Sequence, residues 1–113
     1  MNFFAETESM RCYQGDTLPL FRVAVTGTEV SSCSMVLQLA DAAAPDTAVL
    51  VKECQYYAED TEGFTVRLSS DDTADLAGMY TMLFVLTDGA GKTYKKLVGN
   101  LTFIRAPQEV TPA

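Results

Sequence analysis

The stretch Leu76-Ala77-Gly78-Met79-Tyr80 opens the most continuously apolar segment of this chain, residues 79–87. Such a run is typical of a central strand that the core covers on one face and that is partly covered on the other. A tyrosine at the start of this strand can fill core volume and bond the backbone of the preceding corner through its hydroxyl. We therefore interpret Leu76, Gly78 and Tyr80 as a structural corner. The alternative, that Tyr80 is simply a core aromatic, also makes it structural.

Outward from this corner, helical periodicity is almost absent, and short apolar runs are bounded by Gly, Asp, Ser, Thr and Pro at spacings of about ten residues. Within these runs apolar and polar residues alternate, as in half-buried strands. The pattern predicts seven strands, at 8–13, 18–26, 34–40, 48–53, 64–69, 79–87 and 92–104. The first and the fourth are candidate edge strands, which could extend a sheet across an interface.

The connections between these strands carry turn signals. Asp88-Gly89-Ala90-Gly91 predicts a tight hairpin turn, because glycine supplies the positive φ values that such turns need. Gly99, inside the last strand, indicates a bulge or a close backbone approach. Residues 71–77 suit one helical turn. The resulting architecture is an all-β antiparallel sandwich of about seven strands.

Size and composition bound the classes of function. A chain of 113 residues fits one domain, which we place at 1–105, followed by a flexible C-terminal tail at 106–113. No apolar run approaches the ~20 residues that cross a bilayer, and the N-terminus lacks the features of a signal peptide. The net charge of −7 argues against nucleic-acid binding. The one basic cluster, Lys92, Lys95 and Lys96, is interpreted as a solvated hairpin.

The residue types that catalysis needs are scarce. The chain has no histidine and no phosphate-binding glycine motif, so we predict no enzyme, no cofactor and no catalytic residues. Asp71, Asp72 and Asp75 could bind calcium by type, but a turn capped by these side chains is the preferred interpretation, and no metal site is predicted.

The three cysteines, Cys12, Cys33 and Cys54, are an odd number. Free thiols in a reducing compartment are the preferred interpretation. A Cys12–Cys33 or a Cys33–Cys54 disulfide stays open at this stage.

Aromatic residues are the candidate interface. Phe3 and Phe4 are costly to leave in water, and they dock either on the domain's own sheet or on another subunit. In a strand, Tyr56 and Tyr57 must point to opposite faces, so one of them is expected outside. Together with Tyr13 and Tyr94 they could form a sugar-binding patch, although the absence of tryptophan weakens that alternative.

The order of signals from Gly15 to Ile104 resembles an immunoglobulin-like β-sandwich module found in tail and baseplate proteins of bacteriophages and prophages. The resemblance rests on four stretches: Gly15-Asp16-Thr17, Asp72-Thr73 to Leu76-x-Gly78-x-Tyr80, Phe84-x-Leu86-x-Asp88-x-x-Gly91-Lys92, and Gly99-x-Leu101-x-Phe103. The Cys–Trp–Cys pin of antibody domains is absent, since the chain has no tryptophan.

The resemblance implies a non-catalytic virion component, made in the cytoplasm of a bacterial host, that binds other tail proteins or copies of itself as a homo-oligomer. A module that binds carbohydrate or another cell-surface target, such as a host glycan, is the main alternative. A bacterial accessory domain for secretion or adhesion is a further one.

Overall fold

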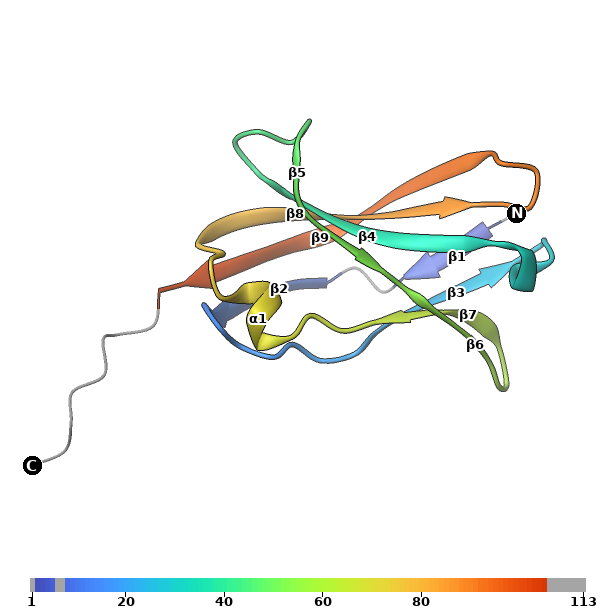
Figure 1. Ribbon diagram of the computed structural model, residues 1–113, viewed down its shortest axis with the longest axis horizontal. Coiled ribbons are helices and arrows are strands. Elements are labelled where there is room, and N and C mark those ends of the chain that lie inside the picture. The colour runs from blue at the N-terminus through green and yellow to red at the C-terminus, as the bar shows by residue number, and fades with distance from the viewer. Residues whose placement is uncertain (1, 6–7, 106–113) are drawn as a thin grey trace, which may run out of the picture.

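The computed structural model describes residues 2–5 and 8–105, with side chains from Ser9 onward, and shows two packed β-sheets (Figure 1). The four-stranded sheet has the order β1-β3-β7-β6, with bounds Asn2–Ala5, Phe21–Thr26, Glu62–Val66 and Gln55–Ala58. The five-stranded sheet has the order β2-β9-β8-β4-β5, with bounds Glu8–Tyr13, Thr93–Ile104, Gly78–Thr87, Ser34–Asp41 and Ala48–Glu53. The predicted immunoglobulin-like all-β sandwich is confirmed. The predicted tail, 106–113, lies outside the described residues.

The core lies between the sheets and follows the alternation in the sequence. Met35, Leu37 and Leu39 on β4 are buried, whereas Val36 and Gln38 between them are only partly buried. Tyr80, Met82, Phe84 and Leu86 on β8 face the same interior, together with residues of the four-stranded sheet such as Val23, Val25, Phe64 and Val66. Burial of one face of each sheet is the main stabilising contribution in a sandwich of this kind.

Two strands beyond the predicted seven arise because the chain changes sheet without a long loop. The segment predicted as one strand at 48–53, with Tyr56-Tyr57 continuing it, is β5 in one sheet and β6 in the other, separated by Cys54. Likewise β1 belongs to the four-stranded sheet and β2 to the five-stranded sheet. Alternation cannot show such a change of sheet, because both halves of the segment keep a period of two.

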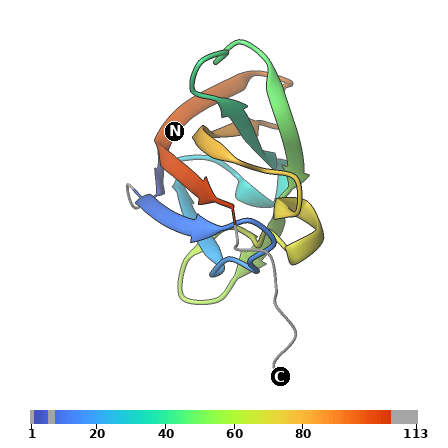
Figure 2. The same cartoon turned by 90° about the vertical axis from the view of Figure 1, so that its left-hand side faces the viewer.

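The sandwich is antiparallel except at one edge, where β2 pairs with β9 in parallel. The reason is chain direction: β2 continues the course of β1, and β9 runs the same way (Figure 1). Viewed from the end where α1 (Ser70–Thr73) lies, β2 runs beside β9, and β5 occupies the opposite edge of that sheet (Figure 2).

The connections hold the sheets in place. Thr73 of α1 is fully buried, and its hydroxyl donates to the carbonyl of Asp16 at 2.7 Å. Gly15, which has a φ of 87°, donates its N–H to the carbonyl of Thr73 at 3.2 Å. The loop between β2 and β3 is thereby tied to the corner that precedes β8. At the other end of β8, Asp88 accepts hydrogen bonds from the N–H groups of Ala90 and Lys92, which closes the predicted hairpin.

Candidate functional site: an apolar sheet face

The outer side of the five-stranded sheet carries a row of side chains that crosses four strands. Leu97 on β9 lies opposite Leu83 on β8, Leu83 opposite Gln38 on β4, and Gln38 opposite Val51 on β5. Directly opposed residues in a ladder share a face. Their neighbours along the strands, such as Leu37, point into the core, so this row points outward.

A second row lies directly beside the first. It runs from Lys95 on β9 through Val85 on β8 and Val36 on β4 to Glu53 on β5. Its centre is apolar, and its two ends carry opposite charges. We call these two rows, eight residues in all, the β9-β8-β4-β5 face.

A β-bulge in β9 places Leu97 on this face. Gly99 lies opposite Met82, but Leu97 lies opposite Leu83, so Val98 is an extra residue in the ladder. Below the bulge, Leu101 points into the core; the extra residue shifts the alternation by one, so that Val98 is buried with 4% of its surface exposed. Leu97 is therefore turned out into solvent. The bulge indicated by Gly99 in the sequence is present, and it decides which apolar side chain the surface shows.

The β9-β8-β4-β5 face exposes large apolar side chains. Leu97 is 63% exposed and Val51 is 55% exposed. Between them, Val85 is buried although it lies outside the core cluster, because its neighbours on the outer surface cover it. Beside the Leu97–Leu83 pair, a shallow hollow of about 230 Å³ is lined by residues that include Ala40 and Pro45. A contiguous apolar surface of this kind marks an interaction site more often than scattered single residues do.

The predicted interface residues lie in the two edge strands of the four-stranded sheet. Phe3 and Phe4 lie in β1, opposite Val25 and Ala24 of β3, and their side chains fall outside the described part of the chain. Tyr56 and Tyr57 lie in β6, in the four-stranded sheet, and not on the β9-β8-β4-β5 face. The grouping of these four residues as one interface stays a prediction.

Tyr56 and Tyr57 are each held by neighbours. Tyr56 packs edge-on against Phe64 with ring centroids 6.1 Å apart, and its hydroxyl donates to Glu62 at 2.8 Å. This hydrogen bond, together with burial and the charge of Glu62, raises the pKa of the Tyr56 hydroxyl above its usual value. The guanidinium of Arg22 lies 5.4 Å from the ring centroid of Tyr57, in cation–π geometry.

The four tyrosines considered for sugar binding are divided between the two sheets. Tyr13 and Tyr94 belong to β2 and β9, whereas Tyr56 and Tyr57 belong to β6. A stacking platform needs its aromatic rings on one surface, so the structure does not assemble these tyrosines into one patch.

The corner residues lie together at the start of β8. The hydroxyl of Tyr80 donates to the carbonyl of Ala77 at 3.0 Å and accepts from the N–H of Ala77 at 3.1 Å. The Tyr80 ring packs edge-on against Phe103, with centroids 5.8 Å apart. Leu76 is buried beneath the corner, and Gly78 has a φ of 99°, a conformation that favours glycine. This is the geometry of a tyrosine corner.

The aspartates after β7 serve the α1 turn. Asp72 and Ser69 form a reciprocal capping box at its N-terminus, and Lys52 pairs with Asp72 at 2.6 Å. Partial burial alone would raise the pKa of Asp72, but the Lys52 ammonium and the hydrogen bonds from Ser69 hold it below its usual value. Within residues 2–5 and 8–105, no group of three or more His, Cys, Asp or Glu side chains could hold a metal ion.

The cysteines are free thiols, and the two disulfides left open by the sequence are not formed. The thiol of Cys33 contacts the carbonyl of Glu29 at 3.5 Å, whereas that of Cys12 contacts the carbonyl of Thr102 at 3.7 Å. Burial raises the pKa of Cys54 to about 12, against a small opposing effect of the Leu37 backbone. Burial, and then the charge of Asp16, also raises the pKa of Cys12.

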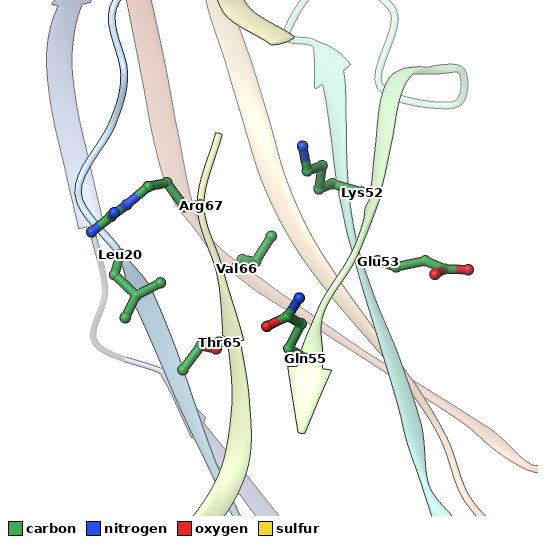
Figure 3. Close-up of a pocket in the computed structure, with 7 residues that line it drawn as sticks. All are labelled: Leu20, Lys52, Glu53, Gln55, Thr65, Val66 and Arg67. Atoms are coloured by element: carbon green, nitrogen blue, oxygen red, sulfur yellow. The ribbon is translucent and has the colours of Figure 1, made fainter. Parts of the chain in front are cut away.

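A second depression, of about 190 Å³, opens where the chain crosses from β5 to β6 (Figure 3). Lys52, Glu53 and Arg67 contribute to its lining, but their charged ends point in three different directions (Figure 3). Lys52 is already paired with Asp72. Because these charges do not converge on one point, the depression lacks the arrangement that would orient a ligand.

The sequence carries a signal for the β9-β8-β4-β5 face in its apolar run at 79–87. The apolar run at 79–87 predicted a strand partly covered on its second side, and Leu83 and Val85 are the residues responsible. Leu97 could not be placed without the bulge.

Fold and face together define an immunoglobulin-like β-sandwich with an exposed apolar sheet surface. No family model matches the chain, and no curated protein matches it. Among solved structures it is similar to AggA, the major subunit of aggregative adherence fimbriae type I from Escherichia coli. That match covers 90% of this chain and 93% of the other, at 10% sequence identity and a TM-score of 0.48. At this level the likeness carries no argument about function. Among the described residues, no helix is long and apolar enough to cross a membrane.

Proposed function

We propose that this chain is a non-catalytic assembly module, a structural component of a phage or prophage particle that acts through protein–protein contacts. The observation that carries the proposal is the β9-β8-β4-β5 face. Leu97 and Val51 stand exposed at its two sides, with Leu83, Val85 and Val36 between them. Removing such a surface from water contributes roughly 25 cal/mol per Å² of apolar area. A partner that covers the face gains this contribution without any rearrangement of the sheet.

The phage or prophage setting rests on the resemblance of the sequence. The four stretches that carry it include the Tyr80 corner, the Asp88 hairpin and the Gly99 bulge. In this proposal the chain is made in the bacterial cytoplasm and ends in the virion. The corner, hairpin and bulge stabilise the sandwich, and the outer face of the five-stranded sheet is left to bind a neighbour.

The carbohydrate alternative has no specific observation in its favour. It requires exposed aromatic rings on one surface, and the exposed tyrosines lie on different sheets. The β9-β8-β4-β5 face itself carries no aromatic ring, so a pyranose would find no stacking partner there.

The test is incorporation into particles. Particles would be induced in the bacterium that encodes the chain and separated on a density gradient, and the chain would be followed with an epitope tag. We expect the wild-type chain to sediment with the particles and the Leu97→Lys variant to stay in the particle-free fractions. Leu20→Lys is the matched control, because Leu20 is also an exposed leucine but lies outside the face. Absence of the wild-type chain from particles, or equal incorporation of Leu97→Lys, would contradict the proposal.

A further inference from the structure

We propose that the β9-β8-β4-β5 face binds a second copy of this chain, in a two-fold symmetric dimer whose axis runs parallel to the strands. This inference rests on the proposed assembly function and names the first partner in it. The argument comes from the order of side chains across the sheet.

The two rows are complementary to themselves under this symmetry. When one sheet is laid face to face on its copy, a two-fold axis between β8 and β4 places β9 over β5 of the copy and β8 over β4 of the copy. Each residue then meets the residue at the mirrored position of its own row. Leu97 meets Val51 of the second copy, Leu83 meets Gln38, and Val85 meets Val36. The two most exposed apolar side chains of the face thereby cover one another.

The charges at the ends of the second row also match. Lys95 on β9 meets Glu53 on β5 of the second copy, and the symmetry forms this pair twice. Both side chains are exposed, and the ion pair between Lys52 and Asp72 includes neither of them. A shift of one copy by one row along the strands would bring Lys95 and Glu53 over apolar residues, which favours this register.

The twist of packed sheets is compatible with the pairing. Face-to-face sheets are rotated by about 30° relative to one another, and the outer strands lie about 7 Å from the two-fold axis. Lys95 and Glu53 of the second copy are therefore displaced from one another by about 4 Å along the strands. The long lysine side chain reaches across such a shift. Leu97 lines the hollow of about 230 Å³, which gives Val51 of the second copy a place to enter.

The size of the face predicts a weak dimer. Four strands at about 4.8 Å spacing and two rows about 6.6 Å apart make a projected face of roughly 250 Å². Two copies would then bury about 500 Å² in total from these rows, which is the range of a weak interface. The dimer is expected to form only at high protein concentration and therefore to be sensitive to single charge changes at its rim.

The experiment uses charge reversal in the full chain. Lys95→Glu places a second carboxylate against Glu53 of an identical copy, and Glu53→Lys places two ammonium groups together, so each variant repels itself at both ends of the row. Sedimentation equilibrium across micromolar to high-micromolar concentrations should show a dimer for the wild type. Each single variant should weaken dimerisation by about tenfold or more. Lys92→Glu, the same charge change at the hairpin tip outside the face, should behave as the wild type.

Sedimentation of an equimolar mixture of the two variants is the decisive measurement. A Lys95→Glu copy and a Glu53→Lys copy form two opposite-charge pairs with each other, so the equimolar mixture should recover the wild-type fraction of dimer. Because all three changed side chains are exposed, circular dichroism and thermal melting should match the wild type. A monomeric wild type, or a mixture no more associated than either variant alone, would overturn the inference.

Failure of this inference is distinguishable from failure of the proposed function. A chain that is monomeric in solution but incorporated into particles would refute the dimer and leave the assembly role standing, with a different protein on the face. A dimer that is absent from particles would refute the particle role and leave the dimer standing.

Discussion

Replacing Tyr80 by phenylalanine isolates what the hydroxyl group contributes to the fold. The hydroxyl makes two hydrogen bonds to one residue, donating to the carbonyl of Ala77 at 3.0 Å and accepting from its N–H at 3.1 Å. The substitution keeps the ring, and with it the edge-on packing against Phe103. The core volume is therefore conserved, and the loss is confined to the corner.

The expected magnitude follows from these two contacts. An intramolecular hydrogen bond contributes about 0.5–1.5 kcal/mol net, so two lost bonds cost about 2 kcal/mol. Ala77 is half-buried, so water replaces the hydroxyl only in part. For a chain of this length, 1 kcal/mol corresponds to a change in Tm of about 4 °C, and the Tyr80→Phe variant should melt about 8 °C below the wild type.

The control is Tyr94→Phe, which removes an exposed hydroxyl whose hydrogen bond to Asp88 is long, at 3.5 Å. Its free energy of unfolding should change by less than about 0.5 kcal/mol. Both variants would be measured by urea titration and by calorimetry, with the m-value checked for constancy. If Tyr80→Phe lost no more stability than Tyr94→Phe, the corner would not stabilise the fold, and the argument from its hydrogen bonds would be refuted.

Three further outcomes follow from single residues. Gly63→Ala should lower the free energy of unfolding by about 3 kcal/mol or more, because the added Cβ would overlap the carbonyl oxygen of Val23 in the β3–β7 ladder. Gly15→Ala has a φ of 87° but open space around it, so it should cost only about 1 kcal/mol. Chemical denaturation measures both values. Cys54 has a pKa raised from 9.0 to about 12, so stability should fall as pH rises from 9.0 towards 12, and a Cys54→Ala variant should show a shallower decline. The pKa of Asp72 is lowered in the folded state, so this group's contribution to stability is present above pH 3.8 and is lost as the pH falls below it. Asp72→Asn should therefore lower the free energy of unfolding by about 1 kcal/mol at neutral pH. The difference from the wild type should shrink in acid.

The core and the corner could be predicted because both depend on local information. The alternation of Met35, Leu37 and Leu39 identifies the buried face of β4 wherever that strand is placed in the sheet. Tyr80 bonds a residue only three positions away, so its contact is visible in a short stretch. The capping of α1 by Ser69 and Asp72 is local in the same way.

The candidate site was not accessible to the same reasoning, since the β9-β8-β4-β5 face joins residues from four strands. Val51 and Leu97 lie in the same row although they are distant in the chain, and only the ladders through Gln38 and Leu83 bring them together. The predicted interface residues, by contrast, stand out in the sequence mainly by residue type.

The sequence by itself determined that this chain forms alternating strands around one buried face, with a tyrosine corner before the central strand, because a period of two and a three-residue contact are local properties. Tertiary structure alone decided which strands are neighbours, where the chain changes sheet at Cys54, and which apolar residues remain outside. The single extra residue Val98 turns the side chain of Leu97 to the outer surface. The free energy of this bulge depends on its pairing with β8, a strand that lies elsewhere in the chain. The surface that we propose as functional is therefore a product of strand pairing, which no single stretch of the chain encodes.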